Sequence, residues 1–79
     1  MNPILKETAV SYLNESLARL PEGNQRIFKL MYGRNDGKRS VEDTEAMPIS
    51  DVIAEIPDEK LDWAMQQAIN SMTKSQYNN

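Results

Sequence analysis

Two pairs of carboxylates have a spacing that could support chemistry. Glu55 and Glu59 are four residues apart, as are Asp58 and Asp62, so each pair would share one face of a continuous helix. Paired carboxylates can bind a metal ion or transfer protons when they are buried and converge. The chain has no histidine and no cysteine, the usual zinc ligands and acid–base or thiol groups. We interpret these acids as solvated charges at helix starts, and we expect no enzyme, no cofactor and no metal site.

Basic and aromatic side chains alternate between residues 26 and 39. Phe28 and Tyr32 lie among five cations, which are Arg26, Lys29, Arg34, Lys38 and Arg39. Such a pattern can hold nucleic acid through phosphate contacts and base stacking. The whole chain, however, has a net charge of −3, the wrong sign for a dedicated nucleic-acid binder. A solvated face that pairs with acidic parts of the chain is the favoured interpretation, and nucleic acid is a disfavoured partner.

The charge changes sign between residues 33 and 47. Residues 19–39 carry six basic and two acidic side chains, a net charge of +4, whereas residues 42–62 carry eight acidic and one basic, a net charge of −7. A basic half followed by an acidic half is typical of a chain that meets a partner or pairs its own halves.

Apolar spacing predicts an all-α fold, a small bundle of four helices. Asn2 can cap and Pro3 can open the first helix, about residues 3–20, with its apolar stripe at Leu5, Ala9, Leu13, Leu17 and Leu20. The second helix, about residues 22–32, follows Pro21, with its inner face at Ile27, Leu30 and Met31 and with Phe28 and Tyr32 beside it.

Two further prolines predict the other two helices. Pro48 opens a helix over about residues 48–56, and Pro57 opens another over about residues 57–72. Between the second and third helices, residues 33–47 form a long loop with a turn signal at 35–37. The sequence thus predicts a single helical domain over residues 1–72 and a disordered tail over residues 73–79.

Composition also predicts where the protein resides. The first residues lack the basic and apolar regions of a signal peptide, and no apolar run is long enough to span a membrane. We therefore expect a cytoplasmic protein that has no membrane partner.

Part of the chain resembles a known family. The run LPEGNQRIFKLMYG, from Leu20 to Gly33, resembles the helix before the helix-turn-helix in region 4 of bacterial sigma factors. Ile49–Ile56 resembles the first helix of that motif, and Lys60–Met72 takes the place of its recognition helix. The resemblance implies a helix-turn-helix-like arrangement with DNA as the ligand.

The sequence departs from that family where the DNA would lie. The turn Ile56-Pro57-Asp58 is short and contains proline where the family has a small residue or glycine. Acids at Asp58, Glu59 and Asp62 would repel phosphate, so a sigma-like chain of this kind fits a protein partner better.

A second resemblance concerns the biological setting. The segments 58–67 and 34–45 together resemble small accessory proteins of lambdoid phages and prophages. This implies a bacterial host cell as the setting and no particular activity.

Two functional hypotheses follow. The first is a non-enzymatic helical module, a phage or bacterial regulator, that binds another protein or a second copy of itself. Its expected contact residues are Phe28, Tyr32, Arg34, Lys38, Arg39 and Trp63. The alternative is a helix-turn-helix DNA-binding transcription regulator that uses residues 52–72, with phosphate contacts from Arg26, Lys29, Lys38 and Arg39.

Overall fold

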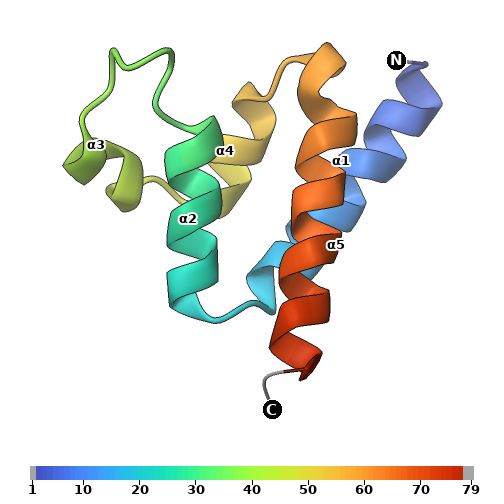
Figure 1. Cartoon of the computed structure of the whole chain (residues 1–79). Helices are drawn as coiled ribbons and strands as arrows, with labels where there is room; N and C mark the ends of the chain where they lie inside the picture. The colour runs from blue at the N-terminus through green and yellow to red at the C-terminus, as the bar shows by residue number, and fades with distance from the viewer. Residues whose placement is uncertain (1, 78–79) are drawn as a thin grey trace.

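The computed structural model describes the backbone of residues 2–77 and the side chains of residues 2–73 (Figure 1). Its elements are α1 (Pro3–Ala18), α2 (Glu22–Tyr32), α3 (Val41–Ala46), α4 (Ile49–Glu55), the 3-10 turn η1 (Asp58–Lys60) and α5 (Leu61–Tyr77). No strand occurs within residues 2–77, and the predicted all-α class is confirmed.

The helix starts follow from local backbone chemistry. The Asn2 side chain accepts a hydrogen bond of 2.9 Å from the Ile4 amide, as an N-cap does. Pro21, Pro48 and Pro57 each stand in extended backbone immediately before α2, α4 and η1. Proline restricts its own φ and cannot continue the preceding helix, so these residues separate the elements as the sequence predicts.

The structure adds a helix, α3, inside the predicted 33–47 loop. The Ser40 hydroxyl accepts a hydrogen bond of 3.0 Å from the Asp43 amide, and Glu42 and Asp43 occupy the first turn. Acidic side chains there face the positive end of the helix dipole. Six residues are too few for an apolar stripe to be recognised, which is why this helix was not predicted.

Two predicted helix ends also shift. The first helix ends at Ala18, two residues before the predicted end. α5 continues to Tyr77, beyond the predicted end at residue 72, so residues 73–77 of the predicted tail are helical. The last two residues of that tail, Asn78 and Asn79, lie outside the described part of the chain.

The core lies where two pairs of helices meet. α1 and α2 each pack against both α4 and α5, and α3 packs against α2. In Figure 1, α2 and α5 lie toward the viewer, with α1 and α4 behind them. The core side chains are Leu13, Leu17, Leu20, Phe28, Val52, Ile53, Ile56, Leu61, Ala64 and Ala68.

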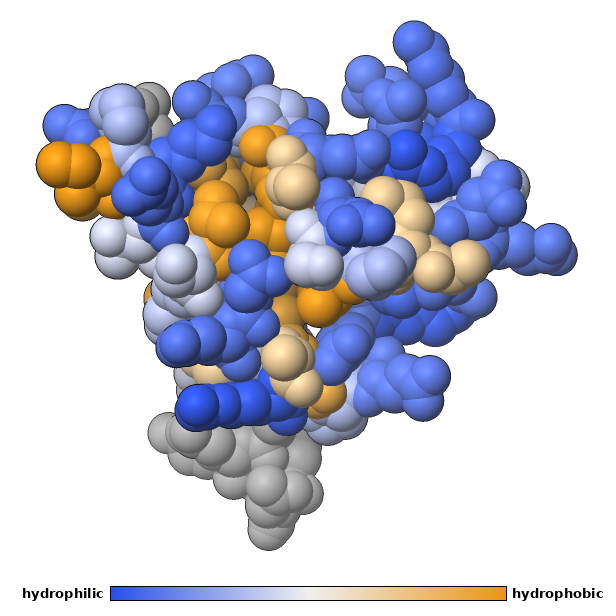
Figure 2. Space-filling model, turned by 180° about the vertical axis from the view of Figure 1, so that it is seen from behind, coloured by the Kyte–Doolittle hydropathy of each residue, from blue (hydrophilic) through white to orange (hydrophobic). Residues whose placement is uncertain are grey.

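The body is thin, with extents of 34 × 33 × 16 Å. A helix with its side chains is about 10 Å across, so most helices bury only one side. On the face opposite to the view of Figure 1, hydrophilic side chains form most of the surface, and hydrophobic atoms show between them in the middle (Figure 2). The described part of the chain contains no helix with the length and apolarity needed to cross a membrane.

α2 is rotated relative to the prediction. Phe28, predicted at the side of the inner face, is 4% exposed in the core, whereas Ile27 and Met31 are 59% and 53% exposed. The rings of Phe28 and Tyr32, one helical turn apart, lie 4.8 Å from each other. The predicted inner face is therefore wrong at Ile27 and Met31, while Leu30 is half-buried, because α4 and α5 pack against the Phe28 side of the helix.

The N-terminal end of α1 also differs from its predicted stripe. Leu5 is 61% exposed, and the first buried residue is Ala9. Leu5 therefore belongs to the surface of the molecule and not to its core.

Candidate functional site

The basic and acidic halves of the chain pair with each other. Arg26 on α2 forms an ion pair with Glu45 on α3. Arg39, in the loop before α3, forms an ion pair with Glu55 at the end of α4. The expected pairing between halves is thus present in the structure.

The Arg39–Glu55 pair is bidentate. The two guanidinium nitrogens Nη1 and Nη2 donate to the two Glu55 carboxylate oxygens at 2.7 and 2.9 Å. The hydrogen bond from Arg39 lowers the pKa of Glu55, and the same bond raises the pKa of Arg39. This planar geometry links the loop to α4 in a defined orientation.

The loop between α2 and α3 has a defined path. Arg39 Nη1 also donates to the Gly33 carbonyl, and Arg34 Nε donates to the Arg39 carbonyl at 3.1 Å. At the tip, Asn35, Asp36 and Gly37 have φ angles of 51, 56 and 81°. Asparagine, aspartate and glycine are the residue types that most readily adopt this left-handed conformation.

The loop forms one wall of a hollow of about 450 Å³. The other walls come from the end of α2, the end of α4 and η1. Its lining consists of Met31, Tyr32, Arg34, Asn35, Asp36, Gly37, Glu55, Pro57 and Lys60.

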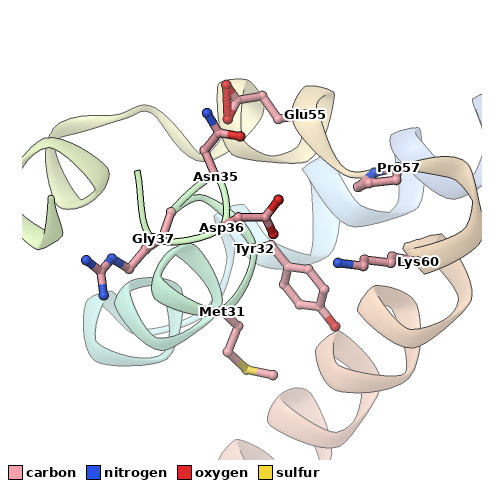
Figure 3. A pocket seen from close by; sticks show the side chains of 9 residues that line it. Met31, Tyr32, Asn35, Asp36, Gly37, Glu55, Pro57 and Lys60 are labelled. Carbon is pink, nitrogen blue, oxygen red and sulfur yellow. The ribbon is translucent and has the colours of Figure 1, made fainter. Parts of the chain in front are cut away.

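Three side chains give the hollow its chemical character. Figure 3 shows Lys60 extending from η1 toward Asp36 and Tyr32 on the opposite wall. Burial raises the pKa of the Tyr32 phenol. Within residues 2–73, Lys60 forms no ion pair.

Exposed apolar side chains occur in the hollow and on the helices α2 and α5. Met31 lines the hollow, and Ile27 lies one turn earlier on α2. Trp63, 69% exposed, lies three residues after Lys60 on the neighbouring helix α5. We call Ile27, Met31 and Trp63, together with the hollow, the α2–α5 face.

The structure places three of the six predicted contact residues at the hollow. Tyr32 and Arg34 line it, and Arg39 binds Glu55 on its wall. Lys38 is exposed next to the tip of the loop, and Trp63, predicted beside the buried stripe, is exposed on α5.

Phe28 is the exception among those residues. At 4% exposure it belongs to the core and offers no surface to a partner. Met31 and Lys60 also line the hollow, and neither was predicted as a contact residue. Lys60 had a recognisable signal, because it is the one basic residue within the acidic stretch 42–62.

The predicted pair of Glu55 and Glu59 does not form on one helix face, whereas Asp58 and Asp62 lie on η1 and α5, which follow each other without a break. Pro57 separates α4 from η1, so Glu55 and Glu59 do not lie on one continuous helix. Glu55 is bound by Arg39, and Asp58 forms an ion pair of 2.8 Å with Lys6 of α1. The Lys6 hydrogen bond lowers the pKa of Asp58. Within residues 2–73, no three acidic side chains converge in a way that could hold a metal ion.

Comparison with protein-family models, with curated proteins and with solved structures finds no significant match to this chain.

Proposed function

We propose that the protein is a non-enzymatic helical interaction module that binds another protein at the α2–α5 face. The observation that carries this proposal is the exposure of Met31 in the lining of the hollow, together with the exposure of Ile27 on α2 and Trp63 on α5. Ile27, Met31 and Trp63 are each more than half exposed. Tryptophan and methionine are enriched in protein interfaces, and tryptophan is a frequent anchor of binding energy.

The charges support a protein partner over DNA. Of the four cations that a DNA-binding role would assign to phosphates, three already have partners within the chain. Arg26 and Arg39 pair with carboxylates, and Lys29 Nζ donates to the carbonyls of Glu45 and Met47 at 2.6 and 3.0 Å. A phosphate would have to compete with each of these contacts.

The setting of this role is the cytoplasm of a bacterial cell, in a phage or bacterial regulatory process. The resemblance to prophage accessory proteins supports that setting, as does the absence of cysteine from the sequence.

Site-specific photocrosslinking in bacterial cells tests the proposal. A benzophenone amino acid placed at Ile27 or Trp63 is expected to give a discrete adduct, because both positions face the partner. The benzophenone amino acid placed at Glu15, an exposed position of α1, is the matched control and is expected to give no adduct. Equal labelling at all three positions, or at none, would contradict the proposal.

A second measurement addresses DNA. Mobility of duplex DNA of mixed sequence is expected to be unchanged by the protein at low salt. Tight binding that weakens steeply as salt rises would favour the helix-turn-helix alternative instead.

An adduct of twice the chain's mass in the photocrosslinking experiment would identify a second copy of the chain as the partner.

A further inference from the structure

The hollow on the α2–α5 face has the size of a binding site. Its volume of about 450 Å³ lies within the range of roughly 300–1,000 Å³ typical of ligand pockets. It is partly open to solvent, so an extended segment of another chain can enter it from the surface.

One part of the lining is apolar. Met31 is 53% exposed, and it is joined by the half-buried ring of Tyr32 and by Pro57. The methionine side chain is flexible and polarisable, so it adapts to the shape of an apolar side chain placed against it. These three residues provide a place for one large apolar side chain of a partner.

The other part of the lining is charged. Its two cations are Arg34 and Lys60, and its two carboxylates are Asp36 and Glu55. Glu55 is neutralised by its bidentate ion pair with Arg39, which lies outside the lining. Arg34, Lys60 and Asp36 form no ion pair within residues 2–73, so the hollow counted with Arg39 has a net charge of +1 in a chain whose total charge is −3.

The wall of the hollow is organised before any partner arrives. Hydrogen bonds from Arg39 to Gly33 and from Arg34 to Arg39 close the loop. The bidentate ion pair between Arg39 and Glu55 fixes the loop to α4. A site whose walls need no ordering loses less conformational entropy on binding.

From these observations we infer that the hollow binds a short acidic segment of a partner protein. A large apolar side chain of that segment packs on Met31, Tyr32 and Pro57, and a neighbouring carboxylate pairs with Lys60. The cations of the hollow select acidic segments over basic ones, because a basic segment would bring like charges together in a partly desolvated site, where they repel. This inference rests on the proposed function and specifies the chemistry of the partner.

Selection from a displayed library of random heptapeptides, with the full-length chain immobilised, tests the inference. The enriched peptides are expected to carry Asp or Glu next to Leu, Ile, Phe or Met. The best peptide is then labelled, and its affinity is measured by fluorescence anisotropy. Enrichment of basic peptides, or no enrichment, would overturn the inference.

Two charge reversals locate the site. Lys60→Glu is expected to weaken peptide binding by about tenfold or more. Arg19→Glu makes the same change on an exposed residue at the end of α1, outside the hollow, and is expected to change the affinity by less than about twofold. Equal effects of the two variants would overturn the inference.

Amide chemical shifts of the unsubstituted protein give a readout that needs no variant. Addition of the selected peptide is expected to shift amides in residues 31–38 and 55–61, which contribute the lining. Shifts confined to α1 would place the peptide elsewhere. If adducts at Ile27 and Trp63 form while no acidic peptide is selected, the interaction module stands and this inference fails.

Discussion

On α2, position around the helix decides the role of each apolar residue. Phe28 is almost fully buried, while its sequence neighbour Ile27 is 59% exposed. Successive residues of a helix are about 100° apart around its axis. Of two neighbours with similar hydrophobicity, one can therefore be buried in the core while the other is exposed to solvent. A stability measurement on matched substitutions can therefore report which side of α2 faces the core.

Ile27→Val and Ile53→Val remove the same methyl group from an exposed and a buried site. Ile53 is 1% exposed, so its substitution is expected to lower the free energy of unfolding by about 1 kcal/mol. Ile27→Val is expected to change it by less than about 0.5 kcal/mol. Urea unfolding followed by circular dichroism measures both, and an equal loss from the two variants would place Ile27 in the core.

Two glycines of the same element, one at each end of α2, give a second matched pair. A Cβ at Gly33 would lie 2.8 Å from the Lys29 carbonyl oxygen and 3.0 Å from the Thr44 methyl group, whereas a Cβ at Gly23 meets nothing within 4 Å. We expect Gly33→Ala to lower the free energy of unfolding by about 1–3 kcal/mol. Gly23→Ala is expected to leave it unchanged or raise it by about 0.5 kcal/mol. The order of the two urea midpoints checks this, and the reverse order would contradict the close packing around Gly33.

At the scale of elements, α3 depends on contacts from outside itself. A helix of six residues is not stable alone in water, because nucleation costs more than so few hydrogen bonds return. Ser40 caps its start, Arg26 pairs with Glu45, and the Lys29 ammonium binds carbonyl oxygens at its end. α2 therefore supplies much of what holds α3 in place.

Lys29→Met is expected to loosen α3 while the rest of the fold stays intact. Loss of the two hydrogen bonds leaves the end of α3 without its charged donor, so exchange of the Thr44 and Met47 amides is expected to accelerate by about tenfold. Hydrogen exchange followed by NMR measures this. Lys6→Met, which removes the lysine paired with Asp58 of η1, is the control and is expected to leave those amides unchanged. Equal acceleration in both variants would mean that Lys29 does not anchor α3.

For the whole molecule, the pairing between basic and acidic parts makes stability depend on pH. The pKa values of Glu55 and Asp58 are lowered in the folded chain by Arg39 and Lys6. A carboxyl whose pKa is lower when folded stabilises the fold above its unfolded pKa, which is about 4. That contribution is lost as the pH falls through the folded pKa.

The urea midpoint is accordingly expected to fall as the pH is lowered from 6 to below about 4. The double variant Glu55→Gln/Asp58→Asn is expected to show a weaker fall, because it has already lost both ion pairs. Glu15→Gln removes an exposed carboxyl that has no ion pair within residues 2–73, and it is expected to retain the dependence of the unsubstituted chain. A double variant with an unchanged pH dependence would show that these pairs do not couple stability to pH.

The sequence predicts most of the residues proposed for the site, but it does not predict how they are arranged in space. Tyr32, Arg34, Lys38, Arg39 and Trp63 were expected to meet a partner. Tyr32 and Arg34 line the hollow, and Arg39 binds Glu55 on its wall. Met31 and Lys60 come from segments about thirty residues apart, and no local pattern indicates that they line one hollow. Long-range packing brings such residues together, and it is not readable from their spacing.

The sequence by itself determined the all-α class and the points at which α1, α2, α4 and η1 begin. Asn2, Pro21, Pro48 and Pro57 act on their own backbone and that of their neighbours, so their effect needs no distant contact. Tertiary structure decided which side of α2 is buried. α4 and α5 pack on the Phe28 side of that helix and leave Ile27 and Met31 exposed. Packing on those two helices selected Phe28 for the core, and Ile27 and Met31 became part of the exposed surface to which we assign a partner.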